Sequence, residues 1–140
     1  MLSVLEIHFA ACCYMTGVIW FVQLVHYPLF LSYDAGTFSL TMKRHQTLTS
    51  FVVGPVMLLE MATGIYLLSS SSVKPSIAAM NLILLVMIWL VTALVSVPLH
   101  AALERSFDAK RAERLVKTNW WRTALWSARC FLLLVGGGLL

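Results

Sequence analysis

Four long apolar runs, separated by short polar stretches, constrain this chain more than any other feature. The runs cover residues 5–31, 47–68, 77–103 and 119–140 of the 140-residue chain. About 20 apolar residues are enough for a helix to cross a bilayer, so each run predicts a membrane-spanning helix. Only 11% of the residues are charged, against about a quarter in a soluble domain, which is too few to cover a water-facing surface. The sequence therefore predicts an all-α integral membrane four-helix bundle that forms one domain.

The polar stretches between the runs predict connections rather than further domains. Residues 32–46 contain charged and glycine positions and are interpreted as a loop. Four consecutive serines followed by Lys74-Pro75 indicate a turn after the second run. The segment from Glu104 to Lys117 alternates its charges at helical spacing, and it predicts an amphipathic connector on the membrane surface. The N-terminus lacks the basic segment and cleavage site of a secretory signal, so the first helix is expected to stay in the protein.

Lysine and arginine positions predict the orientation of the bundle. The first and third connections hold most of these residues, whereas the second holds Lys74 alone. Short loops rich in lysine and arginine stay in the cytoplasm, so both termini are expected on the outer side of a bacterial cytoplasmic membrane. The pI near 9.2 has the same origin, and it suits anionic lipid headgroups. The basic residues lack the interleaved aromatics of a nucleic-acid surface, so membrane lipid is the expected partner and nucleic acid is not.

The ionisable side chains inside the runs are the first candidates for function. A charged group in a membrane helix costs a few kcal/mol and is usually paired or functional. Glu60 lies 13 residues into the second run and Arg129 lies 10 residues into the fourth, at depths of about 20 and 15 Å from the cytoplasmic side. Both depths are close to the midplane. The sequence thus predicts a buried ion pair, which serves either as a clamp between helices or as part of a substrate cavity.

Each run also carries a polar stripe at a spacing of three to four residues, which places its members on one helix face. Because lipid excludes such groups, the four stripes are expected to face one another, either as contacts between helices or as a site. The candidate substrate-binding residues are Trp20, Gln23, Glu60, Trp126 and Arg129. The stripe of the third run consists of Trp89, Thr92, Ser96 and His100. Cys12, Cys13 and Cys130 are interpreted as small packing residues.

Histidines from three runs are expected at one level, near the cytoplasmic ends of the helices. His26 lies near the end of the first run, His45 precedes the second and His100 lies near the end of the third. Asn119 and Arg122, at the start of the fourth run, share this level. Neutral imidazoles bind iron, copper or zinc, and two of them can hold a haem, so a metal site at His26, His45 and His100 is one interpretation. His8, near the other end, is expected to lie isolated at the interface.

Two short motifs resemble a known family. The segments Val97-Pro98-Leu99-His100 and Thr118-Asn119-Trp120-Trp121-Arg122-Thr123 resemble the Val-Pro-Leu-Asn and Trp-x-x-x-Asn-x-x-Arg-Thr pattern of the anthrone-oxygenase-like membrane family. That resemblance implies a four-helix membrane protein, and it implies an oxygenation of anthrones without a cofactor, which is associated with a few fungal members. The matching positions are Pro98, Asn119, Arg122 and Thr123. The chain departs from the pattern at His100, where the family usually has Asn, and at Trp120, where His is common.

A second, shorter similarity concerns haem. Pro55-x-Met57 and Gly64-x-x-Leu67 are similar to motifs of the four-helix, haem-associated protoporphyrinogen oxidase of bacteria. This similarity leaves a haem as one alternative, beside a metal ion or no cofactor.

Three classes of function follow from these observations. The first is an oxidoreductase or oxygenase that acts on a lipophilic aromatic or quinone-like substrate. In that hypothesis His26 or His100 removes a phenolic proton, while Asn119 and Arg122 stabilise the oxyanion, and no cofactor is needed. The second is a haem or metal protein. The third is a non-catalytic membrane subunit, with a small transporter that uses Glu60 as a further alternative. The sequence leaves the oligomeric state open, a homo-oligomer included.

Overall fold

The computed structural model describes residues 1–33 and 35–138, with the side chains of residues 35–37 outside the description. The described residues form helices that join into four rods. The first rod consists of α1 (Val4–Phe21), η1 (Val22–His26), α2 (Tyr27–Leu29) and η2 (Phe30–Ser32), and the second is α3 (Ala35–Ser69). The third consists of α4 (Pro75–Val91), η3 (Thr92–Ser96) and α5 (Val97–Arg105), and the fourth is α6 (Ala109–Gly136).

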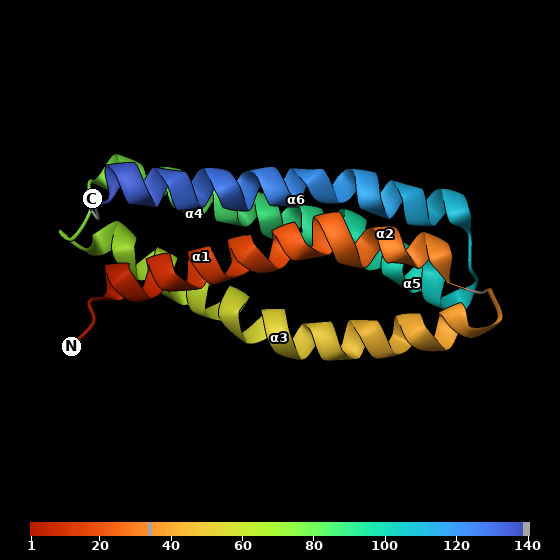
Figure 1. Ribbon diagram of the computed structural model, residues 1–140. Coiled ribbons are helices and arrows are strands. Elements are labelled where there is room, and N and C mark those ends of the chain that lie inside the picture. Colours follow the sequence, from red (N-terminus) through yellow and green to blue (C-terminus); the bar gives the residue numbers. More distant parts are fainter. Residues whose placement is uncertain (34, 139–140) are drawn as a thin grey trace.

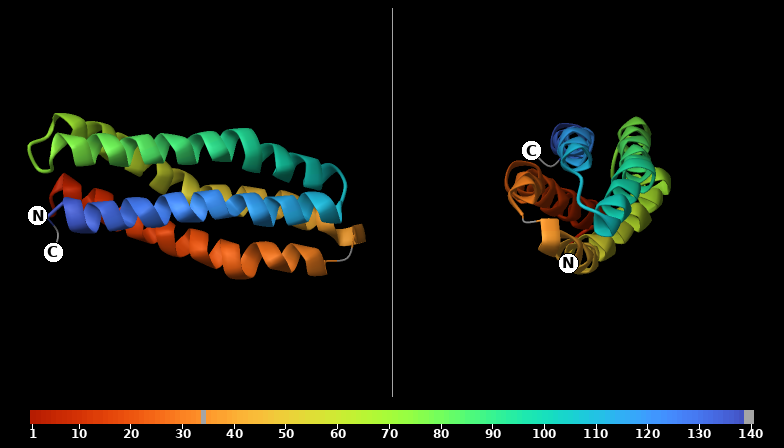
Figure 2. Two further views of the ribbon diagram at one scale, coloured as in Figure 1. Left: turned by 90° about the horizontal axis from the view of Figure 1, so that it is seen from above. Right: turned by 90° about the vertical axis from the view of Figure 1, so that its right-hand side faces the viewer.

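The four rods run alternately in opposite directions (Figure 1). Both chain ends lie at one end of the bundle, together with the turn between α3 and α4, and we call this the terminal end. The opposite end, which holds the link between α5 and α6, is called the basic end. Helix α1 contacts α3 and α6, and α4 contacts α3 and α6, so each rod packs against two neighbours in a four-membered ring (Figure 2).

Three of the rods are long and apolar enough to cross a membrane, namely Val4–Ser32, Phe38–Ser69 and Pro75–Arg105. Helices of this length and composition fit an integral membrane protein. The predicted all-α architecture is confirmed for the described residues. Helix α6 is not among the three, and its apolar half contains Arg122 and Arg129. A span at α6 therefore stays a prediction.

The predicted loop over residues 32–46 is wrong, because α3 already begins at Ala35. Phe38 and Met42 are buried while Lys43 and Arg44 are exposed. This pattern is that of an amphipathic helix, whose apolar face packs on the bundle while its polar face meets solvent or headgroups. The polar composition marks where the chain leaves an apolar environment, and the helix continues past that point.

The predicted surface connector over residues 104–117 is also wrong as a separate element. Its first part ends α5, a short link follows, and its second part forms the first turns of α6. Asp108 caps α6 by accepting hydrogen bonds from the backbone N–H groups of Lys110 and Arg111, at 2.8 and 3.2 Å. The predicted amphipathic pattern is nevertheless present, since Ala112 and Leu115 are buried. The last two residues of the predicted fourth span lie outside the described residues.

Two of the rods contain a π-helical turn directly before a proline. Tyr27 follows η1 and precedes Pro28, and its backbone N–H donates to the carbonyl of Val22, five positions back. Val97 follows η3 and precedes Pro98, and its N–H donates in the same way to the carbonyl of Thr92. Pro28 and Pro98 have no N–H of their own, which frees a carbonyl and allows the wider turn. Turns of this kind occur frequently at functional sites. Here they place polar residues of the first and third rods on the inner side of the bundle.

Candidate functional site

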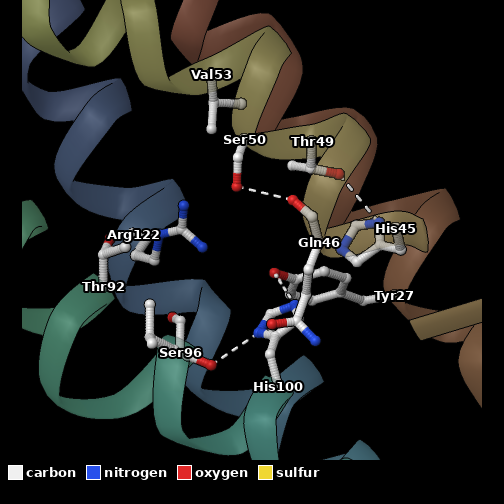
Figure 3. Close-up of a pocket in the computed structure, with 11 residues that line it drawn as sticks. Tyr27, His45, Gln46, Thr49, Ser50, Val53, Thr92, Ser96, His100 and Arg122 are labelled. Carbon is white, nitrogen blue, oxygen red and sulfur yellow. Dashed lines mark hydrogen bonds between the residues drawn. The ribbon is translucent and has the colours of Figure 1, made fainter. Parts of the chain in front are cut away.

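A cavity of about 130 Å³ lies between the rods, toward the basic end. An apolar cavity of about 150 Å³ accommodates a benzene molecule, so this one has the size of a single aromatic ring. Arg122 and Thr92 lie on one side of it, and Tyr27, His45 and His100 lie on the other (Figure 3). The remaining lining residues are Gln46, Thr49, Ser50, Val53, Ser96 and Val97.

His100 is held in one tautomer by its own helix. Its Nδ1 lies 2.7 Å from the backbone carbonyl oxygen of Ser96, and because a carbonyl only accepts, Nδ1 must carry the proton. The other nitrogen, Nε2, is then an acceptor, and the hydroxyl of Tyr27 lies 3.3 Å from it. The pair is thus a phenol that donates to a neutral imidazole. This arrangement is the starting geometry for a proton transfer from a phenol to a base.

The other two histidines extend this cluster away from the cavity. His26 Nε2 lies 2.8 Å from His45 Nδ1, and the Thr49 hydroxyl lies 3.0 Å from the same nitrogen. The ring of His45 stacks on that of His100, with centroids 5.5 Å apart and planes inclined by 18°. His45 lines the cavity, whereas His26 does not. The three predicted histidines are therefore brought together, with His26 behind His45.

Arg122 is the charged group of the cavity, and its charge is not neutralised there. Its side chain is 7% exposed, and the residues that line the cavity include no Asp or Glu. Nη1 donates to the side-chain oxygen of Asn119 at 3.2 Å, and the guanidinium lies 5.4 Å from the centroid of the Trp126 ring. Its Nε has no hydrogen-bond partner in the described part of the chain. Because a buried cation without a counter-ion is costly, the cavity favours a ligand with an anionic or electron-rich oxygen.

A second polar network lies deeper in the bundle and confirms the predicted ion pair. Arg129 Nη1 donates to Glu60 Oε1 at 2.6 Å, and both side chains are fully buried. The other carboxylate oxygen accepts from the indole N–H of Trp126 at 3.2 Å. Arg129 also donates to the side-chain oxygen of Asn81, with Nε and Nη2 each 3.2 Å away. These groups satisfy one another, and none of them lines the cavity.

His8 belongs to this deeper network, so its predicted isolation at the interface is wrong. The side chain is 1% exposed. Its Nδ1 lies 2.7 Å from the hydroxyl of Thr63, and its Nε2 lies 3.1 Å from the side-chain oxygen of Asn81. Asn81 is a partner that periodicity alone does not reveal, because α1 and α4 are distant in sequence.

The other predicted site residues lie beside the cavity or outside it. Gln23 is buried, and it accepts from the Asn119 side-chain amide at 2.9 Å, so both lie behind Arg122. Trp20 is 39% exposed, and its indole N–H donates to the Ser127 hydroxyl at 3.0 Å. Trp20 thus lies on the outer surface of the bundle, away from the cavity. Among the predicted residues, the cavity brings together His45, His100 and Arg122.

Several lining residues were not among the predicted site residues. Tyr27 is the most consequential, because its hydroxyl contacts His100. Its position between His26 and Pro28 is a local signal, since the proline indicates a break in the helix. Thr92 and Ser96 belong to the predicted polar stripe of the third rod. Thr49 belongs to the predicted polar stripe of the second rod, with His45 and Glu60. Ser50 gave no signal beyond its polarity, because helix contacts in membranes use the same residue types.

The described residues contain no group of three or more His, Cys, Asp or Glu side chains arranged to hold a metal ion. In the histidine cluster, His26 and His45 point a nitrogen at each other, so these two nitrogens bond one another. The predicted metal site at His26, His45 and His100 stays a prediction. The three cysteines are free, and Cys13 Sγ lies 3.4 Å from Cys130 Sγ, a contact between the first and fourth rods.

Comparisons with models of protein families, with curated proteins and with solved structures found no match. The resemblances to the anthrone-oxygenase-like family and to protoporphyrinogen oxidase therefore stay predictions.

Proposed function

We propose that the protein is a membrane-embedded oxidoreductase that binds the ring of a lipophilic phenol or hydroquinone in the cavity and removes a phenolic proton there. The observation that carries this proposal is Arg122, a buried guanidinium that lines the cavity and has no carboxylate beside it among the described lining residues. A phenolate oxygen would provide the missing negative charge. The volume of the cavity supports one aromatic ring, with any apolar tail outside in the lipid.

In this proposal His100 is the base. Its tautomer makes Nε2 an acceptor, and the Tyr27 hydroxyl donates to that nitrogen, so a substrate proton reaches His100 through Tyr27 or after the substrate O–H replaces that of Tyr27. Arg122 stabilises the phenolate electrostatically, which is the role of an oxyanion-binding group. Asn119 fixes one nitrogen of Arg122. A deprotonated hydroquinone is electron-rich and can react with O₂ without a cofactor, and the products of the two-electron reaction are the quinone and hydrogen peroxide.

The test uses purified protein in lipid nanodiscs with a long-chain alkyl hydroquinone. Oxygen consumption and quinone absorbance are measured for the wild type, for Arg122→Gln and for His100→Phe. The rate of each variant is expected to fall by at least about 100-fold, which is the effect of removing one oxyanion donor or one acid–base group. Arg114→Gln is the matched control, because Arg114 is exposed on the same helix, and its rate is expected to be unchanged. Equal rates for Arg122→Gln and the wild type would overturn the proposal.

We further propose that all four rods cross a bacterial cytoplasmic membrane, with the basic end in the cytoplasm. The exposed Lys and Arg side chains at the basic end support this orientation, as do the exposed rings of Trp120 and Trp121 in α6. Alkaline phosphatase fused to either terminus is expected to be active, since the enzyme works only outside the cytoplasm. An inactive C-terminal fusion together with an active N-terminal fusion would indicate three crossings instead of four.

A further inference from the structure

The described part of the chain contains three buried polar side-chain atoms without a hydrogen-bond partner, and all three are donors or can donate. They are the indole Nε1 of Trp89, the hydroxyl of Thr92 and Nε of Arg122. Buried donors are paired in most proteins, and an unpaired one calls for an explanation such as a missing ligand. Three of them in one region are therefore informative.

The three atoms lie in neighbouring parts of the bundle. Thr92 and Arg122 line the same cavity, on the side opposite Tyr27, His45 and His100 (Figure 3). Trp89 lies three residues before Thr92, one turn further from the histidines, and residues at this spacing share a helix face. Trp89 itself does not line the cavity, so the row of unpaired donors extends one helical turn beyond the lining residues.

We infer that Thr92 and Trp89, beside Arg122, form a subsite for a second ligand oxygen, one that accepts hydrogen bonds. This inference rests on the proposed function and specifies its substrate class. A monophenol that gives its proton to His100 would leave Thr92 and Trp89 unpaired. A ring with oxygens at opposite ends, such as a para-hydroquinone or the corresponding quinone, reaches the histidines with one oxygen and these donors with the other.

The size and the charge of the cavity agree with such a ligand. Its volume of about 130 Å³ is near the roughly 150 Å³ of a cavity that binds benzene, so it takes one ring and no larger ring system. The lining residues carry a cation and no carboxylate, so an oxygen with partial or full negative charge is favoured on the side of Arg122. A carboxylate at the same position would satisfy the same donors, and it is one of the alternatives that the experiment distinguishes.

The test compares two ligands in nanodiscs, an alkyl para-hydroquinone and the matching alkylphenol that lacks the second oxygen. Equilibrium dialysis gives both dissociation constants under anaerobic conditions. The wild type is expected to prefer the hydroquinone by about tenfold or more, because the alkylphenol leaves buried donors unpaired. Thr92→Val and Trp89→Phe are each expected to reduce this preference while the affinity for the alkylphenol stays unchanged. Thr118→Val is the matched control, because the half-buried Thr118 hydroxyl already donates to the backbone carbonyl of Arg114 and does not line the cavity; it is expected to keep the preference.

The possible failures are distinguishable. If the wild type binds both ligands equally and Arg122→Gln weakens both, the subsite is wrong and the proposed function stands. If neither ligand binds but an alkyl benzoate does, the oxygen subsite takes a carboxylate, and the phenol-binding function is wrong. If no ligand binds, both proposals are wrong, and the donors are satisfied by water only.

A second measurement covers the case in which the substitutions prevent folding. In protein labelled with ¹⁵N-tryptophan, the indole N–H resonance of Trp89 is expected to shift with the hydroquinone and not with the alkylphenol. An unshifted Trp89 resonance in the presence of saturating hydroquinone would exclude Trp89 from the subsite.

Discussion

The buried ion pair between Glu60 and Arg129 is expected to contribute more to stability than any exposed pair in the protein. Substituting Glu60 by Ala leaves the Arg129 guanidinium, which is 0% exposed, without its counter-ion. It also removes the acceptor of the Trp126 indole N–H. Removal of one partner from a buried pair costs about 3–5 kcal/mol of unfolding free energy. We therefore expect Glu60→Ala to destabilise the protein by about that amount.

A second ion pair of the same chain provides the control. Lys117 Nζ lies 3.8 Å from Glu113 Oε2, with side chains that are 79% and 55% exposed. An exposed pair contributes about 0–1 kcal/mol, so Glu113→Ala is expected to have little effect. In the double variant Glu60→Leu with Arg129→Leu, no charge is left unpaired, and the loss is expected to be smaller than the sum of the single losses by about 1–3 kcal/mol.

The assay is reversible unfolding in mixed micelles with increasing SDS, followed by tryptophan fluorescence and circular dichroism. Two results would refute the reasoning. One is a loss below about 1 kcal/mol for Glu60→Ala, which would mean that Arg129 finds water or another partner without penalty. The other is strict additivity in the double variant, which would mean that the two side chains do not stabilise each other.

Two further predictions concern packing between the rods. Copper-phenanthroline under air is expected to form a disulfide between Cys13 and Cys130, since their sulfur atoms are 3.4 Å apart. The disulfide is detected as faster migration of the unreduced chain in SDS gels, and Cys13→Ser is expected to abolish this faster migration. Gly17→Ala is expected to raise stability by about 0.5–1 kcal/mol through helix propensity, because an added Cβ meets nothing within 4 Å. Gly64→Ala is expected not to raise stability, because its Cβ would lie 3.3 Å from the ring of His8. The measurement is thermal unfolding, and an equal gain in stability for both variants would contradict this prediction.

The parts of the fold that depend on local composition could be predicted from the sequence. The first and third rods end within two residues of the predicted bounds, because lipid-compatible runs end where polar residues begin. The second and fourth rods begin about ten residues earlier than predicted. There, Phe38 and Leu115 bury an apolar face against neighbouring helices, and the strength of such packing depends on partners that are distant in sequence.

The depth of the candidate site along the bundle could be predicted from the sequence, whereas the set of side chains that line the cavity could not. The depth of a residue along a helix follows from a constant rise per residue, which is why His45, His100 and Arg122 were expected together. Whether a side chain faces the cavity depends on the rotation of each rod, and the π-helical turns before Pro28 and Pro98 change that rotation. Tyr27, directly after the π-helical turn of the first rod, lies on the cavity.

The sequence by itself predicted that the chain is helical, that four of its runs are long and apolar enough for a bilayer, and that Glu60 and Arg129 lie at a similar depth, where each needs a partner. These conclusions follow from the cost of charge and of unpaired backbone groups in an apolar medium, which is the same for any arrangement of the helices. Only the tertiary structure decided that Glu60 neutralises Arg129 and that the described residues around Arg122 in the cavity include no carboxylate. Such pairing depends on distances between side chains from different rods, and composition does not determine those distances.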